Sequence, residues 1–216
     1  TMLERFPTSH EIYDLVENQR IDFIGCHLSH GITQEITSVP SVKAVCTSTA
    51  GYNHVHPEPG VIITHTPSVL DKTVADFTIS LILANLRNIV GLHQFLWNGS
   101  WNSNQKWDLD ENLSTTLDNS ILGIVGLGEI GREIVSRIAP WGVQILYYDL
   151  SQNAEMENKF PTLHYRSSME EIFAESDIVS LHIPLTHSTQ GIVNQALLKM
   201  MKPNALLVNT ARGPII

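Results

Sequence analysis

The stretch from Ser120 to Asp149 constrains the fold more than any other part of the chain. It opens with the apolar run 121–125, which is too short for a helix and is followed by glycine, so it predicts a buried strand. The sequence GLGEIG follows at 126–131, and apolar residues then recur at helical spacing, which predicts a helix buried on one face. A second apolar run, 143–148, ends the unit directly before Asp149.

Each part of the glycine turn has a physical role in binding a dinucleotide. Gly126 permits a tight turn, Gly128 lets backbone amides approach a pyrophosphate, and Gly131 permits close packing of the helix on the strand. The start of the helix at Glu129 and Ile130 supplies N–H donors and the positive end of the helix dipole. A glycine turn in a protein that binds no dinucleotide is the alternative, and the strand, the helix and the acid that follow at the expected spacing argue against it.

Asp149 follows the second strand, 18 residues after Gly131. A carboxylate at this position accepts hydrogen bonds from the adenosine ribose hydroxyls and repels the 2′-phosphate of NADP. The next residues, Leu150 to Gln152, offer no basic side chain for that phosphate. The sequence therefore predicts NAD as the cofactor, with NADP less favoured.

Composition excludes several classes of partner. The formal net charge is −9 over 216 residues, so no basic surface is expected for nucleic acid. Cys26 and Cys46 have no CxxC spacing, which favours reduced thiols in a cytoplasmic protein. The apolar stretch 77–86 is bracketed by Asp76 and Arg87 at a length too short for a bilayer, so we expect a buried helix and no membrane association.

Strands and helices alternate along the whole chain, which predicts an α/β fold with a doubly wound parallel sheet and a second, smaller domain. We expect a first domain at 1–90, ending in a linking helix, and a nucleotide-binding domain at 91–216. The polar segment 98–114, with Trp101 and Trp107, is expected to be a surface loop. The expected helices are 9–19, 33–39, 71–96, 168–174 and 195–201, and the expected strands outside the glycine unit are 21–26, 42–46, 61–64, 162–166, 177–183 and 205–209.

With these residues assembled, the chain resembles the D-isomer-specific 2-hydroxyacid dehydrogenases. The matching residues are the glycine turn, YYD at 147–149, DIVSLHIPLT at 177–186 with Thr189 after it, and NTARG at 209–213. The turn AGYN at 50–53 is similar to the substrate loop of the glyoxylate and hydroxypyruvate reductases within that family. Formate dehydrogenases are related, but the asparagine they carry ahead of the long helix has no counterpart here. The resemblance implies a Rossmann domain and a smaller flavodoxin-like domain.

Arg212 is a candidate for the substrate site on its position alone. It follows the apolar strand ALLVN, and the carboxyl ends of strands in an open α/β sheet line the ligand crevice. A guanidinium there can bind a 2-oxo acid carboxylate through two parallel hydrogen bonds. A surface arginine that merely ends a strand is the alternative, and the similarity to the family's NxxRG motif, whose arginine binds substrate, argues for the functional interpretation.

The resemblance implies roles for further residues. Backbone amides at Ala50 and Gly51 would hold the substrate carboxylate, and hydride would pass between nicotinamide and C2 of a small 2-hydroxy or 2-oxo acid. For His182 a histidine that ends a buried strand is an equally good interpretation. The positions that match the family's cofactor cleft are His182, Pro184, Thr189, Thr210 and Ala211.

The sequence departs from the family pattern in its acid–base pair. The family's catalytic glutamate and histidine follow the NxxRG strand, and none of the 10 histidines here matches that acid. The family's first strand is missing as well, because residue 1 enters near the first helix. We therefore expect a sequence truncated at both ends, with incomplete domains, a last strand left as an apolar sheet edge, weak NAD binding and little catalysis.

Three alternatives remain at this point. The first is an NAD-dependent oxidoreductase, the second a non-catalytic or degenerate NAD-binding member, and the third another Rossmann protein such as a methyltransferase, which the NxxRG strand disfavours. The apolar helix 71–96 makes a homodimer plausible. His54 and His56 lack a third ligand at a motif spacing, so we expect no metal site.

Overall fold

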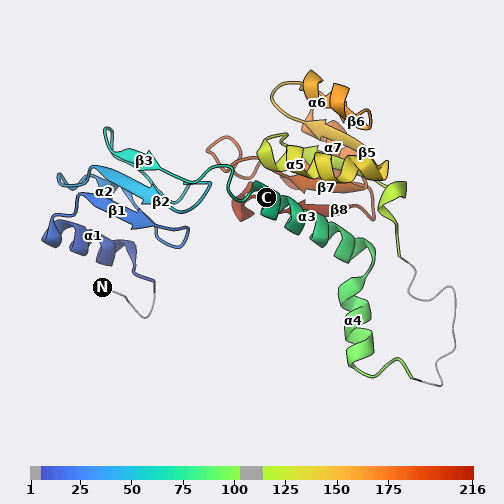
Figure 1. Ribbon diagram of the computed structural model, residues 1–216, viewed down its shortest axis with the longest axis horizontal. Helices are drawn as coiled ribbons and strands as arrows, with labels where there is room; N and C mark the ends of the chain where they lie inside the picture. Colours follow the sequence, from blue (N-terminus) through green and yellow to red (C-terminus); the bar gives the residue numbers. More distant parts are fainter. Residues whose placement is uncertain (1–5, 103–113) are drawn as a thin grey trace. The chain divides into compact units, whose positions relative to one another are not determined.

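The computed structural model describes residues 6–102 and 114–216, and the chain divides into two compact units after Leu70. Each unit contains one parallel sheet with helices packed on it, which confirms the expected α/β class (Figure 1). The division lies before the expected boundary at residue 90, because the helix α3 (Asp71–Leu86) packs against the second unit, which contains the glycine turn.

The first unit is a three-stranded parallel sheet in the order β1-β2-β3. Its first helix begins at a capping box, in which the Glu11 N–H donates to the Thr8 side chain and the Thr8 N–H donates to Glu11 Oε2 over 2.8 Å. That helix buries Ile12 and Val16 against the sheet. The elements are α1 (Ser9–Gln19), β1 (Phe23–Cys26), α2 (Gln34–Thr37), β2 (Ala44–Thr47) and β3 (Ile62–Thr64).

The second unit is built on a five-stranded parallel sheet in the order β6-β5-β4-β7-β8. The central strands are buried on both faces, which explains why their sequences are continuous apolar runs rather than alternating ones. The strands are β4 (Ile121–Val125), β5 (Gln144–Tyr148), β6 (Leu163–Tyr165), β7 (Ile178–Leu181) and β8 (Leu206–Asn209).

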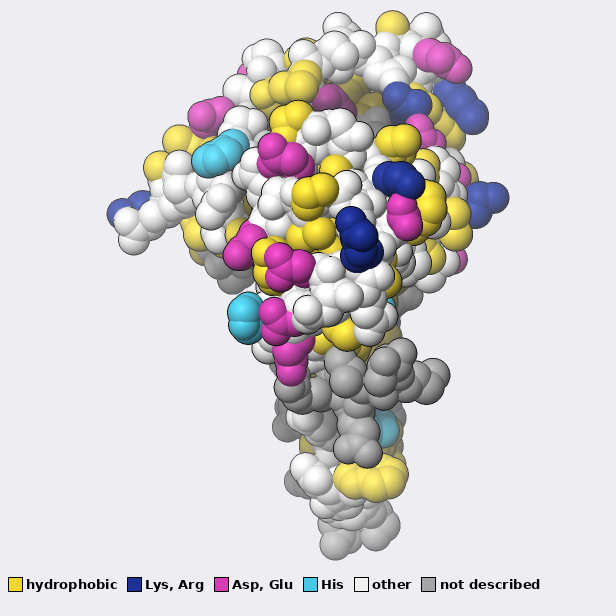
Figure 2. Space-filling view, turned by 90° about the vertical axis from the view of Figure 1, so that its left-hand side faces the viewer, with side chains coloured by type: hydrophobic (Ala, Val, Ile, Leu, Met, Phe, Trp, Pro, Cys, Tyr) yellow, Lys and Arg dark blue, Asp and Glu magenta, His cyan; other side chains and the backbone are white. Residues whose placement is uncertain are grey.

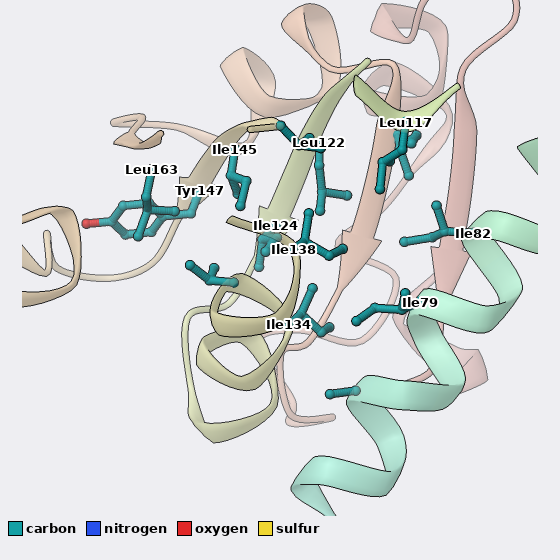
Figure 3. Close-up of a cluster of buried hydrophobic side chains, with 14 of the residues drawn as sticks. Ile79, Ile82, Leu117, Leu122, Ile124, Ile134, Ile138, Ile145, Tyr147 and Leu163 are labelled. Atoms are coloured by element: carbon teal, nitrogen blue, oxygen red, sulfur yellow. The ribbon is translucent and has the colours of Figure 1, made fainter. Parts of the chain in front are cut away.

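Helices cover both faces of this sheet. On one face α3 and α5 enclose a cluster that includes Ile79, Ile82, Ile134 and Ile138 (Figure 3). On the other face α7 and α8 bury Phe173 and the residues around it. The helix α6 was not predicted, because its six residues are mostly polar and carry no apolar period. The bounds are α5 (Glu129–Ile138), α6 (Ala154–Lys159), α7 (Met169–Glu175) and α8 (Gln195–Met200), with 3-10 turns η1 (Leu117–Asn119), η2 (Ala139–Trp141) and η3 (Gly213–Ile215).

The strand order places a topological switch point between β4 and β7. From β4 the chain moves outward to β5 and β6, and it then returns to β7 on the other side and continues to β8. Ligands of open α/β sheets bind beyond the carboxyl ends of the strands at such a point. The glycine turn follows β4, so the fold places it there.

Two predictions for this region were wrong, namely one continuous helix over 71–96 and a buried helix over 77–86. The helix ends at Leu86, and α4 (Ile89–Trp97) starts after Asn88, whose φ of 48° is left-handed, so the two helix axes meet at 62°. Asparagine tolerates this conformation better than most residues. In addition, α3 is buried on one side only, since Phe77 and Leu81 are 58% and 40% exposed.

The surface formed by α4 and the residues that follow it is partly apolar. No residue of α4 is buried, and Trp97 is 82% exposed. Trp101 is 48% exposed, whereas Trp107 and most of the expected loop 98–114 lie outside the described residues. Among the described residues no single helix is long and apolar enough to span a membrane, and α3 with α4 reaches that length only as a bent pair. Described acidic and basic side chains are interspersed on the face in Figure 2.

Candidate functional site

The glycine turn after β4 has the geometry that its sequence requires. Gly126 has φ of 98°, and its N–H donates to Tyr148 O over 2.8 Å. A Cβ at Gly126 would lie 2.7 Å from His182 O, and a Cβ at Gly131 would clash with the carbonyl oxygen of Gly126. The turn, α5 and the end of β7 are therefore packed so closely that neither position accepts a side chain without movement.

Gly128 differs from the other two glycines. It has φ of −71°, and a Cβ built on it would meet nothing within 4 Å, so the protein itself does not require glycine there. Gly128 is also the N-cap of the ten-residue helix α5, and no side chain caps that helix. Open space beside an uncapped helix start fits the pyrophosphate of a dinucleotide. Glu129 and Ile130 begin the helix, and Ile130 packs on the core, so its backbone is the part that remains available.

Asp149 lies at the carboxyl end of β5, next to the glycine turn. Its Oδ2 accepts a hydrogen bond from the Leu127 N–H over 2.7 Å, and its Oδ1 accepts one from the Leu150 N–H over 2.7 Å. Leu127 is 2% exposed and Leu150 is 93% exposed, so the carboxylate bridges the buried turn and a solvent-facing segment. The bond to Leu127 could not be predicted from the sequence, because it depends on the register of β4 and β5.

His182 lies directly after β7, on the other side of the glycine turn. Its N–H donates to Val125 O over 2.7 Å, and its Nε2 lies 2.7 Å from the hydroxyl of the fully buried Ser180. Burial lowers the pKa of His182 from 6.5 to about 4, so the imidazole is uncharged at neutral pH. This geometry accommodates both interpretations of His182, since it ends a buried strand and also borders the switch point.

The segment after His182 is held by its own side chains. Thr189 Oγ1 donates to Pro184 O over 2.6 Å and accepts the Thr186 N–H over 2.7 Å. These bonds shape the loop, so the structure supplies a structural reason for Thr189 beside the proposed role at the cofactor cleft.

The residues after β8 form a compact turn. Asn209 Oδ1 accepts the Ala211 N–H over 3.0 Å, and Asn209 Nδ2 donates to Arg212 O over 2.8 Å. Thr210 Oγ1 lies 2.9 Å from the hydroxyl of Thr78 on α3, which is fully buried. The turn is thus bound to α3. Arg212 follows the carboxyl end of β8 and Asp149 follows the carboxyl end of β5, and because the two strands are parallel, both residues lie on the carboxyl-terminal side of the sheet.

The predicted substrate loop lies in the first unit. The Ala50 carbonyl accepts a bond from His65 Nδ1 over 2.8 Å, and the Gly51 carbonyl accepts one from Thr49 Oγ1 over 2.6 Å. The N–H groups of Ala50 and Gly51 have no acceptor within the described parts of the chain. Such amides can bind a carboxylate. Tyr52 is 46% exposed, and its ring lies 5.1 Å from that of His65.

His54 and His56 are the two histidines that raised the question of a metal site. His54 Nε2 lies 3.1 Å from Thr47 Oγ1 and 4.0 Å from Cys26 Sγ. Within residues 6–102 and 114–216, no group of three or more His, Cys, Asp or Glu side chains is arranged to hold a metal ion.

Comparison with known proteins decides the family. The family model described as D-isomer specific 2-hydroxyacid dehydrogenase, NAD binding domain, matches residues 79–216. The chain belongs to this family. It is 36% identical to a glyoxylate reductase of Thermofilum pendens and 33% identical to one of Aeropyrum pernix, and the matches cover 98% and 100% of the chain.

Solved structures agree with this assignment. A D-lactate dehydrogenase of Aquifex aeolicus, crystallised with NAD and lactic acid, superposes with a TM-score of 0.83 at 25% identity, covering 99% of this chain. That match covers 61% of the Aquifex chain, and each of the two glyoxylate reductases is covered to 62%. The chain therefore spans about three fifths of the length of these relatives.

Proposed function

We propose that this member of the 2-hydroxyacid dehydrogenase family acts as an NAD-dependent oxidoreductase. It would transfer hydride between nicotinamide and a small 2-hydroxy or 2-oxo acid. One observation carries the proposal. The Asp149 carboxylate is fixed on the Leu127 amide of the glycine turn, while Gly128 leaves open space at the uncapped start of α5. A pyrophosphate bound at that space would place the adenosine ribose near Asp149.

The proposed selectivity for NAD follows from charge. Asp149 would accept hydrogen bonds from ribose hydroxyls, and the segment after it offers Leu150, Ser151 and Gln152 but no cation. A 2′-phosphate placed there would meet a carboxylate that is already anchored at both oxygens. NAD is therefore the cofactor we propose.

Arg212 would orient the substrate. Its guanidinium, which follows the carboxyl end of β8, would bind the carboxylate of a 2-oxo acid through two parallel hydrogen bonds. In the first unit, the amides of Ala50 and Gly51 are the further groups that we propose for binding a substrate carboxylate. When bound, nicotinamide would supply the hydride chemistry. Glyoxylate and hydroxypyruvate are the substrates we propose first, supported by the substrate-loop sequence and the two glyoxylate reductases.

Binding of the two dinucleotides tests the cofactor proposal. Isothermal titration should give tighter binding of NAD+ than of NADP+, and Asp149→Asn should narrow that difference by about tenfold or more, since it removes the charge. Asp14→Asn, on the exposed side of α1, is the matched control and should change neither affinity. Equal affinities in the unaltered chain would refute NAD selectivity, and binding of neither dinucleotide would refute the proposed function.

Turnover tests the second part of the proposal. We expect residues 1–216 to oxidise little NADH with glyoxylate, because none of their 10 histidines matches the acid of the family pattern. Measurable turnover that Arg212→Ala abolishes would overturn the expectation of inactivity but support the arginine's role. NAD binding without turnover by the complete reading frame would favour the non-catalytic alternative.

We further propose a homodimer in the cytoplasm. The exposed apolar side chains of α3 and α4, among them Phe77, Leu96 and Trp97, form a surface that a second copy of the chain would cover. The two cysteines are free thiols, which suits a reducing compartment. Sedimentation velocity should show a dimer that Leu96→Glu converts to a monomer, and a monomeric unaltered chain would refute the proposal.

A further inference from the structure

Tyr147 on β5 is an unusual member of the core of the second unit. Its side chain is fully buried in the cluster that α3 and α5 enclose, among aliphatic residues such as Ile145 and Leu163. Its ring centroid lies 5.4 Å from that of Tyr165 on β6. Figure 3 shows the ring beside Leu163, with the hydroxyl oxygen pointing out of the cluster. Phenylalanine would fill the same volume, so the hydroxyl must be explained separately.

The hydroxyl binds the segment that follows Asp149. The Asn153 N–H donates to Tyr147 Oη over 2.7 Å, and Asn153 also caps α6, its Oδ1 accepting the Met156 N–H over 3.0 Å. A buried tyrosine hydroxyl usually has such a partner. The bond therefore fixes the end of a short segment, residues 149–153, which we call the ribose turn.

The start of the ribose turn is fixed as well. Asp149 is anchored by the Leu127 N–H of the glycine turn. A third tether lies between the two ends, because Gln152 Nε2 donates to Glu157 Oε2 over 2.7 Å and Glu157 Oε1 accepts the Tyr165 N–H over 2.9 Å. The backbone of the ribose turn is thus held in one position although Leu150 to Gln152 face solvent.

We propose that Tyr147 is a positioning residue that sets the preference for NAD over NADP by holding the ribose turn in place. This inference rests on the proposed function, because NAD and NADP differ only at the ribose 2′-oxygen that the turn would face. A 2′-phosphate needs more room than a hydroxyl and must avoid the Asp149 carboxylate. A fixed ribose turn leaves no space for the 2′-phosphate, whereas a ribose turn without the Tyr147 hydrogen bond can move away from it.

The test compares Tyr147→Phe with Tyr165→Phe by titrating NAD+, NADP+, AMP and nicotinamide mononucleotide into the chain. Tyr165 contributes to the same ring pair, but its hydroxyl has no bond among the described residues, so it is the matched control. Tyr147→Phe should weaken NAD+ and AMP by similar factors and leave the mononucleotide unchanged. It should also reduce the NAD+ to NADP+ affinity ratio by about 3- to 10-fold, the range of one net hydrogen bond.

A second variant keeps the proposal testable if Tyr147→Phe fails to fold, as judged by circular dichroism. Gln152→Ala releases the ribose turn at an exposed side chain and should lower the same ratio by about twofold or more. An unchanged ratio in folded Tyr147→Phe, an equal change in Tyr165→Phe, or an unchanged ratio in Gln152→Ala where Tyr147→Phe does not fold would overturn the inference. Failure of the unaltered chain to bind either dinucleotide would instead overturn the proposed function on which it rests.

Discussion

Replacing the glycines of the turn one at a time separates what the fold requires from what the cofactor requires. Gly126→Ala imposes a φ of 98° on a residue with a side chain and places Cβ 2.7 Å from His182 O. The left-handed conformation costs about 1–2 kcal/mol and overpacking about 1–3 kcal/mol, so the second unit should lose about 2–5 kcal/mol of unfolding free energy. Gly142, which lies outside the turn, has φ of 77° and no neighbour within 4 Å of an added Cβ, so Gly142→Ala measures the cost of the left-handed conformation alone.

Gly128→Ala should have the opposite profile. Its φ is ordinary and its Cβ meets no atom, so the loss of stability should stay below about 1 kcal/mol, the difference between glycine and alanine as N-caps. The added methyl group would occupy the space in which we place the pyrophosphate. NAD+ binding should therefore weaken by at least about tenfold, or about 1.4 kcal/mol.

Urea unfolding followed by circular dichroism gives the stabilities, and isothermal titration gives the affinities. The expected order of stability loss is Gly126→Ala, then Gly142→Ala, then Gly128→Ala, while only the variants at 126 and 128 should impair binding. If Gly128→Ala binds NAD+ as well as the unaltered chain does, the dinucleotide does not lie over the turn. If it unfolds as readily as Gly126→Ala, the assignment of separate roles is wrong.

Three further predictions concern stability. The pKa of His182 is lowered from 6.5 in the unfolded state to about 4 in the folded protein, so the unfolded state takes up the proton first as the pH falls. The free energy of unfolding should therefore fall by about 3 kcal/mol as the pH is lowered from 6.5 to 4. His182→Gln should remove most of that pH dependence. Asp177→Ala should cost about 1–3 kcal/mol, because it strips the Ile121 N–H of its acceptor, whereas Lys202→Ala should cost less than about 1 kcal/mol; equal losses in urea unfolding would contradict this. Phe173→Ala, at a fully buried site, should cost about 3–5 kcal/mol by the same assay.

Much of the second unit could be predicted because its signals are local. The run before Gly126 and the run before Asp149 became β4 and β5, and the glycine positions show the constraints that their spacing implied. The family resemblance, carried by short motifs, was confirmed by the match over residues 79–216.

What could not be predicted depends on contacts between distant residues. The bond from the Leu127 N–H to Asp149 and the pairing of Thr78 with Thr210 arise only when strands and helices are assembled. The break at Asn88 was missed because the apolar pattern continues across it and no proline or glycine marks it. The roles of the site residues in binding cofactor and substrate remain predictions.

The hydroxyl pair between Thr78 and Thr210 joins positions 132 residues apart and has a consequence for where this domain can be cut. The family similarity starts at residue 79, but the fully buried Ala75 and Thr78 belong to the earlier turns of the same helix. A polypeptide begun at the edge of the similarity would leave the turn before Arg212 without its anchor and uncover part of the sheet. Dissection of the protein should therefore start no later than Asp71, where the helix itself begins.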